Sequence, residues 1–260
     1  MKHLITKSKD GTIKITFNEY SSVIIPTINN KHSVCVSCQI GCPIGCKFCF
    51  SGKTKFKRNL SSEEIIDQVE AANKIISKNP DSVVFMGMGE PSLNLKNVLE
   101  AASEINTKFN VSRNKITIST SGLQNLNTLL NIPFNIAISL HSPFDKIRKQ
   151  LIPGATSVRK IVNFSNKYLK NKNNKKYIMI EYALIKDLND SNKDLKKLLS
   201  LKWPKKTIFN LIEFNSLNGF EKSEKILEFK QKIIQAGYKC FIRMSRGKDI
   251  KAACGMLSNQ

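Results

Sequence analysis

Five of the seven cysteines of this chain lie within the fifteen residues CVSCQIGCPIGCKFC, which begin at Cys35. Crowded thiols can form disulfides, hold zinc or hold an iron–sulfur cluster. Disulfide frameworks usually stabilise chains too short to build a core, whereas this chain has 260 residues, of which 41% are hydrophobic. Zinc sites usually have two separated cysteine pairs, but Cys42, Cys46 and Cys49 form a single C-x3-C-x2-C run. This spacing favours an iron–sulfur cluster, with a zinc or redox loop as the alternative.

Short apolar runs alternate along the chain with longer segments of helical periodicity. Strands are expected near 33–37 and at 82–88, 115–120, 135–140, 177–185, 207–214 and 239–245. Helical periodicity covers 61–78, 94–109, 157–170, 191–201 and 223–237. Ser62 is the expected start of the first helix and Gly237 the expected end of the last, and an exposed loop is expected at 170–176. The alternation predicts an α/β fold, a partial (β/α)6 TIM-like barrel over 33–260 with a β-rich extension over 1–32.

Ligands of parallel α/β folds bind at the carboxyl ends of the strands. Polar residues follow several of the expected strands at this end. They are Gly89 and Glu90, Ser119 to Ser121, Ser139 to His141, Asn215 and the cysteine loop. We therefore expect these groups to face one mouth of the barrel.

The chain is strongly basic, with 42 Lys and Arg against 20 Asp and Glu, a net charge of +22. The excess is spread over KSKDGTIK, SGKTKFKRN, KYLKNKNNKKY and LKWPKK rather than confined to one tail. A basic face of this kind favours a nucleic-acid partner, the alternative being an ordinary solvated surface in a Lys- and Asn-rich protein. No apolar N-terminal signal or membrane-length apolar run is seen, so we expect a cytoplasmic protein without membrane contact.

Several motifs occur in a fixed order along almost the whole chain. They are CVSCQIGCPIGCKFC, KRNLSSEEIIDQV, VFMGMGEPSLN, ITISTSGL, AISLHSPFDKIRKQLIP, IEYALIKDLND and NLIEFN, with SKDGTIK at the start and RGKDIKAACGML at the end. Together they resemble the RlmN/Cfr family of radical S-adenosylmethionine (SAM) rRNA adenine methyltransferases.

The resemblance implies a role for each matching residue. Cys42, Cys46 and Cys49 would ligate a 4Fe–4S cluster whose open iron binds SAM. The other SAM contacts would be Gly89, Glu90, Ser119, Ser139, Leu140, His141 and Asn215. Cys254 would carry a methyl group and Cys35 would be its partner thiol. The implied partners are RNA (23S rRNA and also tRNA), an electron donor such as flavodoxin or ferredoxin, and a thiol reductant, with the protein a monomer.

The implied chemistry explains why two thiols are needed besides the cluster ligands. Carbon 2 or carbon 8 of adenine has no lone pair with which to attack a sulfonium, whereas a thiolate is a good nucleophile. Cys254 would take a methyl from one SAM, and a second SAM would be cleaved to a 5′-deoxyadenosyl radical that removes hydrogen from this methyl. The methylene radical would add to the base. After proton loss, Cys35 would attack the sulfur of Cys254, releasing methyladenine and leaving a disulfide that a reductant resets.

The chain departs from the family pattern in two places. It begins where an additional helical N-terminal domain would have ended, so we expect a short form. Ser21 stands where the family has a glutamate proposed as proton acceptor, and Glu19 would replace it if the two residues shared a strand face. No family role falls on Cys38.

The interpretation is therefore an enzyme that methylates carbon 2 of an adenosine in RNA. Carbon 8 methylation is the nearest alternative. A radical SAM enzyme acting on a peptide or small molecule and an RNA-binding protein with a vestigial cluster are the others.

Overall fold

The structure is a computed structural model that describes residues 3–170, 177–216 and 219–257. The chain forms two compact units. Unit 1 comprises Met1–Gly45, Cys49–Ser119 and Arg246–Gln260, and unit 2 comprises Cys46–Phe48 and Thr120–Ser245. Most of the expected exposed loop at 170–176 lies outside the described residues. In the described part, no helix has the length and apolar character that crossing a membrane requires.

Unit 1 is built on a sheet in the order β1-β2-β3-β4-β7-β8. The first four strands are antiparallel, and β4, β7 and β8 are parallel. Their bounds are Leu4–Lys7 (β1), Ile13–Thr16 (β2), Ser21–Pro26 (β3), His32–Cys35 (β4), Ser82–Phe85 (β7) and Ile116–Thr120 (β8). A separate antiparallel pair consists of β5 (Gln39–Ile40) and β6 (Arg58–Asn59).

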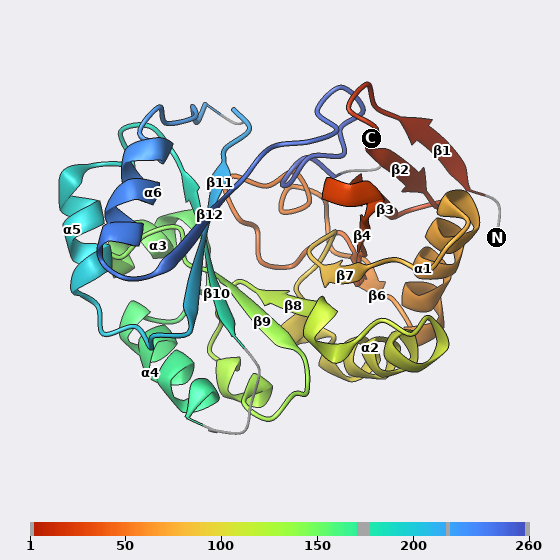
Figure 1. Ribbon diagram of the computed structural model, residues 1–260, viewed down its shortest axis with the longest axis horizontal. Coiled ribbons are helices and arrows are strands. Elements are labelled where there is room, and N and C mark those ends of the chain that lie inside the picture. The colour runs from red at the N-terminus through yellow and green to blue at the C-terminus, as the bar shows by residue number, and fades with distance from the viewer. Residues whose placement is uncertain (1–2, 171–176, 217–218, 258–260) are drawn as a thin grey trace. The chain divides into compact units, whose positions relative to one another are not determined.

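Helices α1 (Ser62–Ile76) and α2 (Leu95–Lys108) lie side by side in unit 1 (Figure 1). The cap of α1 is Ser61, one residue before the expected start, and it forms a capping box with Glu64. Its hydroxyl accepts from the Glu64 N–H while the Glu64 carboxylate accepts from the Ser61 N–H, so two helix-end donors are satisfied. Short 3-10 turns lie at Ile28–Asn30, Pro91–Leu93 and Arg113–Lys115.

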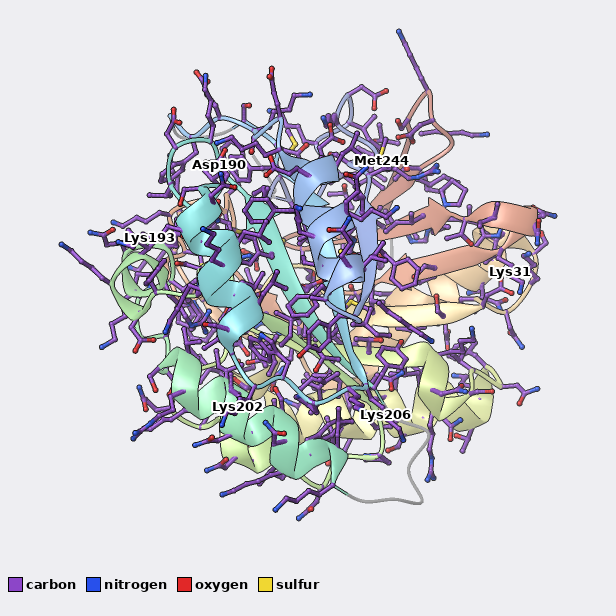
Figure 2. All side chains as sticks on the ribbon, turned by 60° about the vertical axis from the view of Figure 1, so that its left-hand side comes forward. Lys31, Asp190, Lys193, Lys202, Lys206 and Met244 are labelled. Atoms are coloured by element: carbon purple, nitrogen blue, oxygen red, sulfur yellow. The ribbon has the colours of Figure 1, made fainter. Side chains whose placement is uncertain are left out.

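Unit 2 contains four parallel strands in the order β9-β10-β11-β12. They are Asn135–Ser139 (β9), Ile178–Leu184 (β10), Thr207–Glu213 (β11) and Lys239–Arg243 (β12). The helices are α3 (Asp145–Leu151), α4 (Val158–Leu169), α5 (Asn192–Ser200) and α6 (Ile226–Gln235), with a 3-10 turn at Leu126–Leu129. Figure 2 looks onto the α5 and α6 layer, with Lys193 on α5 and Lys202 and Lys206 in the segment between α5 and β11.

The predicted α/β class with mostly parallel strands is confirmed. Every expected strand and helix is present, although β7 ends at Phe85, three residues early. The chain turns there because Gly87 packs against the backbone of Val36, where a Cβ would approach to 2.8 Å. Helix α3 was not predicted, since seven residues are too few to establish a helical period.

Within each unit, the expected polar groups follow the carboxyl ends of parallel strands. In unit 1 the cysteine loop, Gly89–Glu90 and Ser119 lie at the ends of β4, β7 and β8. In unit 2 the turn 139–141 follows β9 and Asn215 follows β11, and both strands pair with β10. That both sets face a single mouth stays a prediction.

Candidate active site

The cysteine loop is closed at its base by the β5–β6 pair. Lys57 N–H donates to Ile40 O at 2.9 Å, and Leu60 N–H donates to Cys38 O at 3.0 Å. Gly41 has a φ of +71°, and a Cβ there would lie 2.3 Å from Lys55 O, so the returning chain needs glycine at this position. The loop is thus an irregular segment whose two ends are fixed by hydrogen bonds.

Two thiols of this loop, those of Cys42 and Cys49, act on each other electrostatically. Burial raises the pKa of Cys42 to about 12, and the charges of Cys49 and Glu90 add to the rise. Burial also raises the pKa of Cys49, to which Cys254 contributes. Cys46 belongs to the stretch 46–48 that packs in unit 2, where Lys47 N–H donates to Leu151 O at 3.0 Å.

No group of three or more His, Cys, Asp or Glu side chains within residues 3–170, 177–216 and 219–257 is arranged to hold a metal ion. The donor set nevertheless fits an iron–sulfur cluster, because three cysteines share one loop and the thiols of Cys42 and Cys49 interact. Binding iron as thiolates would release the protons that burial holds on these sulfurs. Cluster ligation by Cys42, Cys46 and Cys49 stays a prediction.

The C-terminal segment of unit 1 docks on the cysteine loop. Phe50 N–H donates to Gly255 O at 2.8 Å, and Ser51 Oγ donates to Leu257 O at 2.7 Å. These bonds hold the residues directly after Cys254, whose sulfur is exposed and acts electrostatically on Cys49. The fold therefore brings together two cysteines that are 205 positions apart in the sequence.

The other end of the same segment is attached to the turn between β1 and β2. Asp10 accepts from Gly247 N–H at 2.8 Å and from Thr12 N–H at 2.9 Å. Asp249 accepts from Ser8 Oγ at 2.6 Å and from Lys9 N–H at 3.2 Å. Sequence reasoning gave neither aspartate a role. Their place in the motifs SKDGTIK and RGKDIK was the available signal.

Removing the Asp10 carboxylate is expected to loosen the segment that carries Cys254. Burial alone would raise the pKa of Asp10, but hydrogen bonds from Thr12, Gly247 and Ser8 outweigh it and lower the pKa from 3.8 to about 2. Because the folded-state pKa is lowered, this stabilisation is complete above pH 3.8 and is lost as pH falls through about 2. We predict that Asp10→Ala increases hydrogen exchange of the Gly247 amide about tenfold or more at neutral pH.

Asp81→Ala is the matched control, because Asp81 also accepts a backbone N–H in unit 1, from His32 at 2.9 Å. This variant should leave the Gly247 amide as protected as in the wild type. Equal exchange in Asp10→Ala and the wild type would contradict the attachment.

The turn GMGEP runs along residues 36–39, just before the cysteine loop. Gly89 has a φ of +105°, and a Cβ there would lie 2.6 Å from the Gln39 Cβ. Gln39 Oε1 accepts from Glu90 N–H at 2.8 Å, while Ser37 Oγ accepts from Met88 N–H at 2.8 Å. Glu90 is buried, and one carboxylate oxygen accepts from Ser92 N–H at 3.1 Å. A buried carboxylate held beside Cys42 suits the expected contact with the SAM amine.

The remaining site residues of unit 1 lie on strands or in turns. Cys35 is the last residue of β4 and is buried, and Ser119 is buried on β8. The argument that Glu19 shares a strand face with Ser21 is wrong, because β2 ends at Thr16 and β3 begins at Ser21, leaving Glu19 in the turn. Glu19 is half-buried there and forms an ion pair with Lys57, whereas Ser21 is fully buried. A catalytic role for Glu19 stays a prediction.

In unit 2, Asn189 fixes the turn that follows β9. Its amide donates to His141 O at 2.6 Å and to Ala183 O at 2.8 Å, and its Oδ1 accepts from Ile185 N–H at 2.7 Å. These bonds hold His141 at a φ of +55°, in the left-handed region that non-glycine residues seldom adopt. Asn189 is fully buried, so the turn is fixed from within the protein.

His141 is held as a neutral ring. Burial, with the positive charge of Arg148, lowers its pKa to about 3. Its Nδ1 accepts from Ala183 N–H at 3.0 Å, so the single ring proton must lie on Nε2. The ring meets Phe48 edge-on, with centroids 4.7 Å apart. The expected SAM contact thus lies against the aromatic residue that precedes Cys49.

A fully buried arginine, Arg148 on α3, connects the segment 139–140, which contains expected SAM contacts, with residues 121–122, which follow β8. Nη1 donates to Ser139 O at 2.5 Å and Leu140 O at 2.7 Å. Nη2 donates to Ser121 O at 2.5 Å and Gly122 O at 3.3 Å, and Nε to Thr156 O at 3.2 Å. Sequence reasoning missed this residue because Arg is rarely fully buried, and nothing in the local pattern marks the exception.

Asn215 lies after the end of β11 and is buried. Its Oδ1 accepts from Ser245 Oγ at 2.5 Å, and Ser245 N–H donates to Glu213 at 3.4 Å. These bonds tie the end of β11 to the residues that follow β12. The SAM contacts assigned to Ser139, Leu140, His141 and Asn215 stay predictions.

Known proteins resemble this chain over nearly its full length. The profile of the Radical SAM superfamily matches residues 36–199. The dual-specificity RNA methyltransferase RlmN of Buchnera aphidicola subsp. Acyrthosiphon pisum (strain APS) is 40% identical over 273 residues, covering 96% of this chain and 74% of that protein. The probable dual-specificity RNA methyltransferase RlmN of Clostridium botulinum (strain Loch Maree / Type A3) is 39% identical, covering 99% and 79%. A crystal structure of a radical SAM methyltransferase from Sphaerobacter thermophilus matches with a TM-score of 0.87 and 31% identity, covering 98% of this chain and 80% of that one.

Proposed function

The chain belongs to the RlmN family of radical SAM RNA methyltransferases, and from this premise we propose that it methylates carbon 2 of an adenosine in 23S rRNA and in tRNA. RNA methylation that depends on a 4Fe–4S cluster and SAM is the family's activity, so the proposal concerns the base, the carbon and the RNA. The observation that carries it is the docking of the Cys254 segment on the cysteine loop. A methyl-carrying thiol has to lie close to the place where SAM is cleaved.

Cys42, Cys46 and Cys49 would hold the cluster, with Glu90 and the turn 139–141 as SAM contacts. The cluster, when bound, would supply the electron, and SAM would supply the carbon radical that the reaction needs. Cys254 is exposed, so its sulfur can accept a methyl group. The methyl carbon, still attached to this sulfur, would then form a bond to the base.

The radical adduct would lose the ring proton and return one electron to the oxidised cluster. Cys35 would then attack the sulfur of Cys254, whose bond to the methylene carbon breaks while that carbon takes up a proton. The two thiols are oxidised to a disulfide as methyladenosine leaves, and a thiol reductant restores them. None of the seven cysteines, each within the described residues, is paired in a disulfide. The partners of this scheme are RNA, a one-electron donor of the flavodoxin or ferredoxin type and a thiol reductant, all in the cytoplasm, with the enzyme a monomer.

Nucleoside analysis tests the proposal. RNA from cells with and without this protein is digested, and its nucleosides are compared by mass spectrometry for rRNA and tRNA separately. We expect 2-methyladenosine only in cells that contain the protein. If 8-methyladenosine appears instead, the proposed carbon is wrong and the enzyme methylates carbon 8. The absence of any protein-dependent methylated adenosine in both RNAs would overturn it.

A further inference from the structure

One row of paired residues crosses the four strands of unit 2. Ser139 on β9 pairs with Glu181 on β10, Glu181 pairs with Asn210 on β11, and Asn210 pairs with Phe241 on β12. Paired residues of parallel strands project from the same face of a sheet. The row therefore leads from an expected SAM contact, Ser139, to the last strand of unit 2. With strands about 4.8 Å apart, its two ends are on the order of 14 Å apart.

The row lies on the face away from the helices. Tyr182, next to Glu181, packs against Phe229 of α6 with ring centroids 6.2 Å apart. Phe209, next to Asn210, packs against Trp203 at 5.9 Å. Since successive strand residues point to opposite faces, Glu181 and Asn210 point away from this helix layer. In Figure 1, α5 and α6 lie along one side of β10 to β12.

Phe241 stands out in this row because 57% of its surface is exposed. Its neighbour Cys240 is buried and is affected by the charge of Lys230 on α6, so Cys240 faces the helix layer and Phe241 the other way. Lys239 and Arg243, two residues before and after, share the face of Phe241. An exposed aromatic ring with a basic side chain beside it suits single-stranded nucleic acid, because a base can stack on the ring and the cation attracts an adjacent phosphate.

The middle of the row is polar and buried. Glu181 accepts from Arg243 Nη1 at 3.1 Å and from Asn210 Nδ2 at 3.3 Å, and its side chain is 5% exposed. This charged group fixes Arg243 beside Phe241. Arg243, two residues after Phe241 on the same strand, is thus held by a buried carboxylate.

We propose that Phe241 is a stacking platform for an unpaired base of the RNA substrate, with the exposed Lys239 at a neighbouring phosphate. The inference rests on the proposed function and names the part of unit 2 that receives the RNA. Phe241 is a binding residue in this scheme. The turn 139–141, which begins at the other end of the row, is where we expect SAM to bind.

Fluorescence anisotropy tests the platform with the full chain carrying its reconstituted cluster. Two labelled RNA hairpins are used at one salt concentration, one with a single unpaired adenosine in the loop and one with an abasic site there. Phe241→Ala should bind the adenosine hairpin about tenfold more weakly than the wild type and the abasic hairpin equally. Phe241→Trp should retain wild-type affinity. Leu227→Ala, which removes an apolar side chain that is 64% exposed on α6, is the matched control and should change neither.

The outcomes separate this inference from the proposed function. If Phe241→Ala binds both hairpins as the wild type does, or loses affinity only for SAM, the platform is wrong, whatever the nucleoside analysis gives. If no RNA is methylated but the adenosine preference still depends on Phe241, the platform stands and the proposed function fails. If the wild type does not distinguish the two hairpins, the platform is also wrong.

Discussion

Cys254→Ala is expected to abolish adenosine methylation, with a fall of at least about 10³-fold in turnover. Cys254 is the exposed thiol in a segment that Phe50 and Ser51 hold by hydrogen bonds, and no other group nearby is proposed to carry the methyl. Without its sulfur, nothing joins the methyl group to the adenine carbon. Methylated nucleoside from supplied RNA, measured by mass spectrometry, and the mass of the intact protein are the two readouts. The wild type should carry one methyl group that the variant lacks.

Cys240→Ala is the matched control for the loss of a cysteine. Cys240 is buried on β12, and burial raises its pKa to about 12, so it is a poor nucleophile. This variant should keep methylation near the wild-type rate. If Cys254→Ala retained full methylation, the scheme with a methyl-carrying cysteine would be wrong. Equal circular dichroism spectra of the two variants would exclude loss of the fold as the cause.

Most of the fold could be predicted from the sequence because parallel strands and amphipathic helices leave strong periodic patterns. Strand β8, for example, is buried at all five positions, and four of its five residues (Ile-Thr-Ile-Ser-Thr) are β-branched, as strands favour. The family was also predicted correctly, since ordered motifs cover nearly the whole chain. Element ends were less certain, as with Ser61 at the start of α1, because adjacent serines are equally good caps.

What could not be predicted depends on contacts between distant segments. The motifs at the two chain ends were recognised separately, but the bond from Gly247 to Asp10 follows only from the fold. The position of Glu19 was misjudged because the sequence NEYSS does not reveal where one strand ends and the next begins. Helix α3 was missed as well, and with it the most heavily hydrogen-bonded side chain of the candidate site.

That side chain, Arg148, provides the second large prediction. Its guanidinium bonds the carbonyls of Ser139 and Leu140 on one side and of Ser121 and Gly122 on the other. Arg148→Met keeps apolar volume but leaves these buried carbonyls without their donor, at about 1–3 kcal/mol for each group that water cannot reach. We expect unfolding to become easier by about 3–5 kcal/mol. SAM binding should weaken by tenfold or more, because no side chain then holds the segment 139–140 in a fixed position relative to residues 121–122.

Arg148→Lys separates positioning from general stability. Lysine keeps the charge but replaces the planar fork with one ammonium, so it bonds one segment and not both. It should recover part of the free energy of unfolding, measured by urea denaturation, while the KM for SAM stays raised and the KM for RNA stays near the wild-type value. A role in stability alone would predict that both KM values return to normal as stability returns. A wild-type KM for SAM in Arg148→Lys would therefore show that the two segments keep their geometry without the guanidinium fork.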